Sequence, residues 1–147
     1  MECSAQGPLV VVEDGDEDFE VLGLALQRCG YTGAVRRFVD GEEALAFLTL
    51  PAEGRGAEGW PCLVLLDLNL PGMDGREVLQ ALRASPHGRL VPIVVLSTSR
   101  NPRDVRFCYE AGANCYAIKP VGLSEFEELV ARLVEFWFSM MQLPTPG

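Results

Sequence analysis

Four short apolar runs in this sequence each lead directly into residues that can do chemistry. Leu9–Val12 precedes Glu13 and Asp14, Leu63–Leu66 precedes Asp67, Ile93–Leu96 precedes Ser97, and Tyr116–Ile118 precedes Lys119. Clustered carboxylates disfavour one another's ionisation unless a cation joins them. Mg²⁺ is the natural cation for such a set, because it prefers oxygen ligands and bridges to phosphoryl oxygens. Carboxylates, a hydroxyl and an ammonium group together therefore suit a metal ion and a phosphoryl group.

The elements that carry these residues are predicted from the same runs. Short stretches rich in Val, Ile and Leu, separated by helical patterns, are typical of buried parallel strands. The expected strands cover residues 9–12, 35–39, 63–66, 93–96 and 115–118. With right-handed crossovers, this alternation predicts an α/β fold, a flavodoxin-like doubly wound sheet of five parallel strands in the order 2-1-3-4-5 with helices on both faces. Because ligands bind where the carboxyl ends of such strands emerge, we expect the polar residues to meet in one crevice.

Within that crevice, the residue types favour phosphoryl transfer. Asp67 is the best candidate for a nucleophile, because it follows a buried run and precedes a turn-rich loop that exposes its side chain. Lys119 would neutralise charge on the phosphoryl oxygens, and the Ser97 hydroxyl would donate a hydrogen bond to the product phosphoryl group.

Composition sets further bounds on the protein. The 147 residues are 48% hydrophobic and 22% charged, so we expect one globular domain over residues 9–141, with tails at 1–8 and 142–147. The net charge of −9 argues against nucleic acid as a partner, since such binding relies on clustered Lys and Arg. We find no secretory or membrane-spanning apolar stretch, which favours a cytoplasmic protein with no membrane partner. The five widely spaced cysteines are expected to be free thiols.

Three other stretches have simpler explanations than a ligand site. Pro51–Pro61 carries three glycines, and we expect a long surface loop in which Trp60 covers the core. The acidic residues Asp16–Asp18 fall in the first turn of a predicted helix, where they complement the helix dipole. His87 lies in a turn far from the strand ends, so a solvated loop residue is a simpler explanation than a catalyst or phosphocarrier.

The sequence resembles a response-regulator receiver domain of two-component signalling. The motifs that carry the resemblance are Val12–Asp14, Asp40–Leu45, Leu66–Gly75, Val95–Ser97, and Ala111–Ala113 continuing to Lys119–Pro120. The resemblance implies that Asp67 accepts the phosphoryl group from a sensor histidine kinase, and that Ser97 and Lys119 are the family's hydroxyl and lysine. It also implies that Asp14, Asp67 and the backbone carbonyl of Asn69 bind Mg²⁺, with Glu13 assisting through water. Tyr116 falls at the aromatic switch position, whose ring turns inward once the Ser97 hydroxyl moves to the phosphoryl group.

More narrowly, the sequence is similar to the stand-alone regulators paired with phytochrome histidine kinases. The supporting features are the extended loop before Pro61, Leu68–Pro71, Leu96–Ser99, Asn114–Tyr116, Phe136–Trp137 and Leu143–Pro144. Those regulators tend to be dimers, and the last helix has more apolar surface than one core-facing stripe needs. We therefore expect a homodimer through Phe136, Trp137, Phe138 and Met141. Glu13 replaces the commoner Asp, and Thr98 stands where Ala or Gly is usual, which could restrict access to the phosphoryl group.

Two other functions remain open at the level of sequence. An aspartate-nucleophile phosphohydrolase uses similar chemistry but needs a second acid two positions after the nucleophile, where this chain has Asn69. A pseudo-receiver would bind partners without chemistry, although every required group is present. The favoured interpretation is a phospho-accepting signalling protein that catalyses only its own phosphorylation and dephosphorylation.

Overall fold

The computed structural model describes residues 7–56 and 59–144. The main elements are β1 (Leu9–Val12), α1 (Asp16–Arg28), β2 (Val35–Phe38), α2 (Gly41–Leu48), β3 (Leu63–Leu66), α3 (Gly75–Ala84), β4 (Ile93–Ser97), α4 (Pro102–Glu110), β5 (Cys115–Ile118) and α5 (Leu123–Glu135). A short 3-10 helix, η1 (Ala52–Gly54), precedes β3, and a π-helical segment, η3 (Phe136–Met140), follows α5. The predicted strands agree with these bounds to within one residue.

The five strands form one parallel sheet in the order β2-β1-β3-β4-β5, which confirms the predicted flavodoxin-like topology. Every residue of β1, β3 and β4 is buried, because these central strands are covered on both faces. Val12, at the end of β1, pairs in register with Phe38 of β2 and Leu66 of β3. The carboxyl ends of these three strands therefore lie level with one another at one edge of the sheet.

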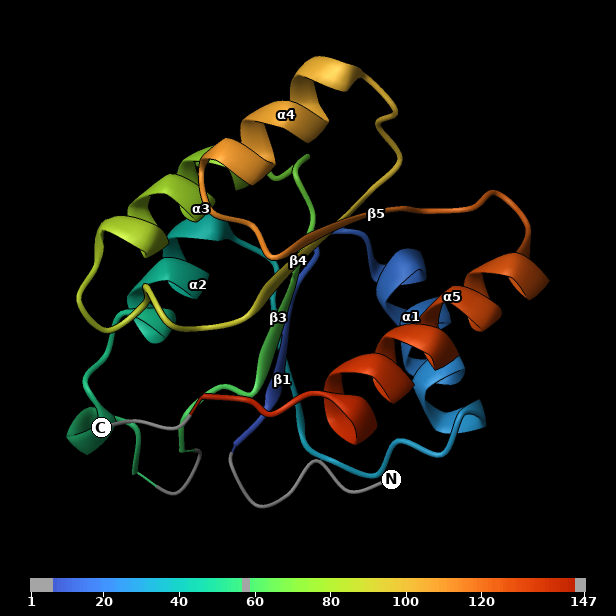
Figure 1. The fold of residues 1–147 in the computed structure, drawn as a ribbon, viewed down its shortest axis with the longest axis horizontal. Coiled ribbons are helices and arrows are strands. Elements are labelled where there is room, and N and C mark those ends of the chain that lie inside the picture. The colour runs from blue at the N-terminus through green and yellow to red at the C-terminus, as the bar shows by residue number, and fades with distance from the viewer. Residues whose placement is uncertain (1–6, 57–58, 145–147) are drawn as a thin grey trace.

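The helices cover the two faces unequally (Figure 1). Helices α1 and α5 pack together on one face, while α2, α3 and α4 cover the other. A hydrophobic core lies on each face of the sheet, and successive residues of a strand point into alternate cores. Val10, Val12 and Leu66 point to the α2–α4 side, whereas Leu9 and Leu65 point to the α1 and α5 side.

Three helices begin at side-chain caps that the sequence encodes locally. Asp40 accepts hydrogen bonds from the backbone N–H groups of Glu42 and Glu43 at the start of α2. Asp74 caps α3 and Asn101 caps α4 in the same way. Helix α1 differs, because its N-cap residue is Gly15, which has no side chain to accept a capping hydrogen bond.

Arg55 holds the loop between α2 and β3, near the amino-terminal end of β3. Arg55 is 5% exposed, donates to the carbonyls of Leu48 and Leu50, and has its guanidinium carbon 5.1 Å from the ring centroid of Trp60. Trp60 itself is buried against the core, as predicted.

The guanidinium of Arg83 ties three segments of chain together. Its Nε donates to the Gly112 carbonyl at 2.8 Å, and Nη1 donates to the Val91 carbonyl at 2.7 Å. Its Nη2 donates to the side chain of Asn114 at 2.8 Å. Arg83 thereby joins α3 to the loops that precede β4 and β5.

The C-terminal segment packs back onto the domain. Trp137 is 8% exposed and lies in the α1 and α5 core, and the Phe138 ring stacks on Tyr31 with centroids 5.3 Å apart. Phe136 and Met141 are 39% and 42% exposed. Of the predicted tails at 1–8 and 142–147, residues 1–6 and 145–147 lie outside the described residues. Cys3 lies outside them as well.

Two predictions of absence are tested in the described part of the chain. Cys29, Cys108 and Cys115 are free, in agreement with the expectation from their spacing. Among the described helices, none has the length and apolarity that a membrane crossing requires.

Candidate functional site

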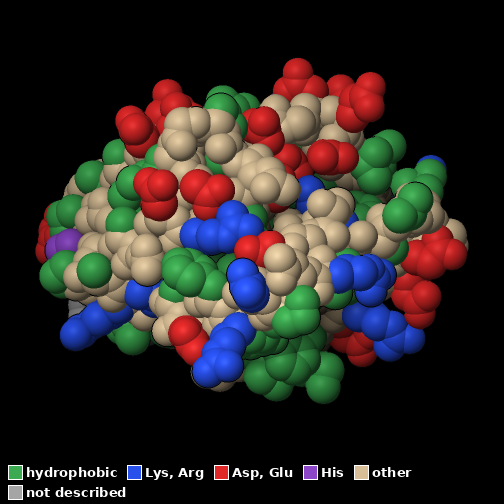
Figure 2. Space-filling view, turned by 90° about the horizontal axis from the view of Figure 1, so that it is seen from above, with side chains coloured by type: hydrophobic (Ala, Val, Ile, Leu, Met, Phe, Trp, Pro, Cys, Tyr) green, Lys and Arg blue, Asp and Glu red, His purple; other side chains and the backbone are tan. Residues whose placement is uncertain are grey.

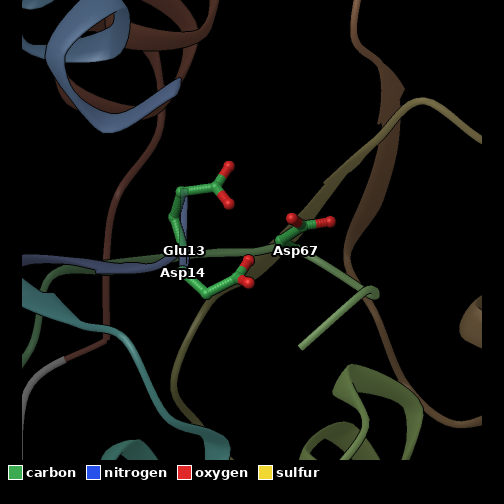
Figure 3. A group of neighbouring side chains, drawn as sticks. All are labelled: Glu13, Asp14 and Asp67. Carbon is green, nitrogen blue, oxygen red and sulfur yellow. The ribbon is translucent and has the colours of Figure 1, made fainter. Parts of the chain in front are cut away.

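Three carboxylates meet at the edge of the sheet where β1 and β3 end. Glu13, Asp14 and Asp67 each offer an oxygen, and these oxygens all lie within 4.8 Å of one another. Figure 3 shows the three carboxyl groups gathered between the ends of the two strands. A set of hard oxygen donors at this spacing fits a small divalent cation such as Mg²⁺ or Mn²⁺. The convergence predicted from the strand ends is therefore present in the structure.

Backbone hydrogen bonds between neighbouring strands hold this corner. The N–H of Asp67 donates to the Val12 carbonyl at 3.1 Å, and the N–H of Glu13 donates to the Phe38 carbonyl at 3.0 Å. The loop after Asp67 is tied locally as well, because the N–H of Asn69 donates to Asp67 Oδ1 at 3.3 Å. Only glycine fits at position 75, since a Cβ there would collide with the carbonyl oxygen of Asp67.

Lys119 enters the same corner from the end of β5. It is the only lysine in the sequence. Its Nζ lies 2.6 Å from Glu13 Oε1, 3.7 Å from Asp67 Oδ2 and 3.9 Å from Asp18 Oδ2. The side chains of Lys119 and Glu13 are only 12% and 7% exposed, so their ion pair is largely shielded from water. The ammonium group thus lies between the carboxylates, with Glu13 as its nearest partner.

Burial and charge shift the protonation equilibria of this pair. Burial raises the pKa of Glu13 and the nearby Asp67 charge adds to this effect, whereas the hydrogen bond from Lys119 opposes it. Burial alone would lower the pKa of Lys119. The hydrogen bond to Glu13 and the surrounding carboxylates outweigh burial, so the pKa of Lys119 is raised and the ammonium stays charged.

The two predicted switch residues, Ser97 and Tyr116, meet at Ser99. Ser97 is fully buried, and its Oγ accepts a hydrogen bond from the Ser99 N–H at 3.1 Å. The Tyr116 hydroxyl donates to the Ser99 carbonyl at 2.8 Å. The Ser99 hydroxyl in turn donates to Asp104 at 2.5 Å, and Arg76 holds the same carboxylate at 2.6 Å. The loop after β4 is therefore hydrogen-bonded to β5, to α4 and, through Arg76, to α3.

Several of these contacts were not anticipated from the sequence. The interpretation of Asp16 and Asp18 as partners of the helix dipole alone is incomplete, because Asp18 approaches Lys119 and Asp16 pairs with Arg37 at 2.9 Å. Asp104 and Arg76 belong to different helices, and their spacing in the sequence gives no sign that they pair.

A hollow of about 420 Å³ opens beside the acidic corner, between α1 and the loop that joins β5 to α5. Glu13, Thr98 and Lys119 line the end of the hollow nearest the carboxylates, and the remaining lining is mainly apolar. Figure 2 views the molecule from this edge, where acidic and basic side chains lie intermixed. The hollow gives a ligand room to approach Lys119 from solvent.

Comparison with known proteins agrees with this geometry. The model of the response regulator receiver domain family matches residues 9–131. The chain belongs to this family. Receiver domains partner with histidine kinases and bind Mg²⁺ or Mn²⁺ at an acidic site. In this receiver, Glu13, Asp14 and Asp67 form an acidic cluster whose oxygens could hold a metal ion.

Three relatives cover nearly all of this receiver. The probable methanogenesis regulatory protein FilR2 of Methanothrix harundinacea is 37% identical over 97% of the chain and 92% of its own length. The crystal structure of the phosphorylated cyanobacterial phytochrome response regulator RcpA has a TM-score of 0.86 and 38% identity, covering 96% of this chain and 100% of RcpA. The Mn²⁺-bound form of response regulator Rcp1, a Synechocystis protein, has a TM-score of 0.82 and 34% identity, covering 95% and 99%.

Proposed function

We propose that this receiver is a response regulator of a two-component phosphorelay and accepts a phosphoryl group from a histidine kinase on Asp67. The observation that carries the proposal is the single ammonium group of Lys119 set among the carboxylates of Glu13, Asp14 and Asp67 at one edge of the sheet. The receiver acts in signalling and catalyses only its own phosphorylation and dephosphorylation.

Each group in the corner has a defined task in the transfer. A carboxylate oxygen of Asp67 bonds to phosphorus as the nitrogen–phosphorus bond of a phosphohistidine donor breaks, and the imidazole keeps the bonding electrons and takes up a proton. Asp14, Asp67 and the backbone carbonyl of Asn69 would hold Mg²⁺, with Glu13 assisting through water. When bound, the ion supplies positive charge beside the phosphoryl oxygens.

Lys119 and Ser97 respond to the phosphoryl group once it is attached. Lys119 Nζ is already 3.7 Å from Asp67, so a small movement away from Glu13 brings the ammonium onto a phosphoryl oxygen. The Ser97 hydroxyl donates to another phosphoryl oxygen. Since Ser97 and Tyr116 both bond to Ser99, that movement shifts the loop after β4 and changes the surface presented to a partner.

Acetyl phosphate with Mg²⁺, followed by intact-mass measurement, tests the phosphorylation site. We expect one added phosphoryl group, none in EDTA and none in Asp67→Asn. Asp40→Asn is the matched control, because asparagine is an equally good helix cap and this residue lies outside the acidic corner. Turnover of p-nitrophenyl phosphate would instead indicate a phosphohydrolase, and complete inertness would indicate a pseudo-receiver.

The kinase partner we propose is of the phytochrome type, working in the cytoplasm without a membrane or nucleic-acid partner. The likeness to RcpA, a phytochrome response regulator, supports this pairing. The net charge of −9 opposes binding to a phosphate backbone. Phosphotransfer from a purified phytochrome kinase should be faster than from an unrelated histidine kinase at equal concentration. Equal rates from the two kinases would contradict the pairing.

We further propose a homodimer through the C-terminal segment. Of the four candidate residues, Phe136 and Met141 keep about two fifths of their surface exposed, at 39% and 42%, and can contact a second copy. Trp137 and Phe138 pack within the domain and would support them from behind. Sedimentation should show a dimer that Phe136→Ser with Met141→Ser converts to monomer. A wild-type monomer, or a dimer that survives both changes, contradicts this interface.

A further inference from the structure

Arg37 of β2 reaches over the turn that follows β1. Its Nε donates a hydrogen bond to the backbone carbonyl of Glu13 at 3.0 Å, and its Nη1 pairs with Asp16 Oδ1 at 2.9 Å. The guanidinium carbon lies 4.7 Å from the ring centroid of Phe19. One planar group therefore joins the last residue before Asp14 to the first turn of α1. These three contacts fix its orientation, and its side chain is only 21% exposed.

The turn from Glu13 to Gly15 needs such support. It carries two of the three clustered carboxylates, so its backbone decides where they point. Helix α1 begins at Gly15 without a side-chain cap, and Glu13 Oε2 accepts a hydrogen bond from the Gly15 N–H at 3.2 Å. Local interactions alone thus leave one end of the turn weakly held. Arg37 supplies the connection from outside, through a carbonyl that the turn itself does not use among the hydrogen bonds described.

We propose that Arg37 is a positioning residue for the metal site, holding Glu13 and Asp14 in the geometry that a divalent cation requires. The proposal rests on the metal site proposed above. Groups that orient metal ligands without touching the ion typically change metal affinity by about 10-fold to 100-fold when removed. Charge alone predicts the opposite effect, because a guanidinium near the site repels a cation. The sign of the change therefore separates a positioning role from simple electrostatics.

Two substitutions exploit this difference. Arg37→Met removes the charge together with the contacts, and Arg37→Lys keeps the charge but cannot donate to a carbonyl and a carboxylate along two fixed directions. Arg36→Met is the matched control. Arg36 neighbours Arg37 on the same strand, but its guanidinium lies 5.1 Å from the Phe47 ring of α2, on the other face of the sheet.

The affinity of each protein for Mn²⁺ is measured by electron paramagnetic resonance. Thermal unfolding in EDTA is recorded for the same proteins. We expect both Arg37 variants to bind Mn²⁺ on the order of 10-fold more weakly than wild type, while Arg36→Met binds normally. The affinity is measured well below the melting temperature of each variant, so a general loss of stability does not weaken it. Arg37→Lys, which keeps the charge and most of the stem, preserves the test if Arg37→Met does not fold.

Unchanged or tighter Mn²⁺ binding in either Arg37 variant overturns the positioning role. Wild-type protein that binds no Mn²⁺ overturns the proposed metal site instead, so the two failures are distinguishable. Loss of binding in Arg36→Met equal to that in Arg37→Met also overturns the proposal, because it assigns the effect to β2 as a whole.

Discussion

Replacing Lys119 with methionine removes the only positive charge that contacts the buried carboxylates directly in the described structure. Lys119 Nζ is 2.6 Å from Glu13 and 3.7 Å from Asp67. Counted over the whole residue, Glu13 is 5% exposed and Asp67 is 9% exposed. Breaking one half of a buried ion pair typically costs 3–5 kcal/mol, and we take about 3 kcal/mol because the corner opens onto a hollow. For a domain of this size, that loss corresponds to a fall in Tm of roughly 6–12 °C in EDTA near neutral pH.

This deficit should depend on pH in a defined direction. Burial already raises the pKa of Glu13, and Lys119 opposes that rise, so the pKa of Glu13 is higher still in the variant. A carboxyl with a raised folded pKa favours folding at low pH, and this contribution is lost as the pH rises through the folded pKa. The deficit of the variant should therefore be smaller at about pH 5 than at about pH 7, because lowering the pH favours the protonated form of Glu13.

A divalent cation should restore stability by a second route. The cation replaces the missing ammonium between the acids, and binding to the folded state alone adds about 2.7 kcal/mol at a hundred times its Kd. Because Lys119 no longer competes for Glu13, Lys119→Met should gain more stability from Mg²⁺ than wild type does. Phosphorylation by acetyl phosphate should nevertheless be lost, since no ammonium is left to meet the phosphoryl oxygens.

Urea unfolding of wild type, Lys119→Met, Glu13→Gln and the double variant checks the reasoning at both pH values, with EDTA and with Mg²⁺. Glu13→Gln should rescue part of the Lys119→Met deficit, because it removes the unpaired charge. A deficit that is the same at both pH values, with and without Mg²⁺, would falsify the electrostatic account and attribute the loss to packing.

Four further substitutions test other parts of the structure. Gly75→Ala should destabilise the domain and reduce phosphorylation, because its Cβ would collide with the Asp67 carbonyl, whereas Gly23→Ala in an open stretch of α1 should stabilise by about 0.5–1 kcal/mol in urea unfolding. Arg83→Lys should cost about 2 kcal/mol by the same measurement, because lysine cannot bridge the three segments that the guanidinium joins. Hydrogen bonds from Ser99 and Arg76 lower the pKa of Asp104, so this group stabilises the fold above its unfolded pKa and the benefit is lost as the pH falls through the folded value. Asp104→Asn should therefore melt below wild type at neutral pH, and the difference should narrow below about pH 4.

The sheet and the meeting of its polar ends were predictable because parallel strands constrain both. Central strands such as Leu63–Leu66 must be apolar throughout, and their carboxyl ends share one edge. The residue that follows each strand is therefore placed by topology alone, which is why Asp67 and Lys119 could be paired from the sequence. The caps at Asp40 and Asp74 are equally local, since each contacts the backbone within three residues.

The partners of long polar side chains could not be predicted in the same way. The sequence pattern places Lys119 at the edge, but its preference for Glu13 over Asp67 depends on the lengths and rotamers of both side chains. Arg37 of β2 pairs with Asp16 of α1, and their spacing in the sequence does not predict this ion pair. The stacking of Phe138 on Tyr31 likewise depends on the π-helical geometry of η3, which the helical period of α5 does not encode.

The solitary lysine of this receiver also decides how the protein can be handled. Reagents directed at primary amines, such as succinimide esters, have only the chain's amino terminus and Lys119 to attack. The Lys119 amine is held charged and largely shielded, so labelling at moderate pH is directed to the amino terminus and leaves the acidic corner intact. Fluorophores or surface tethers attached by this chemistry should therefore yield a singly tagged regulator that still accepts phosphate, without any engineered cysteine.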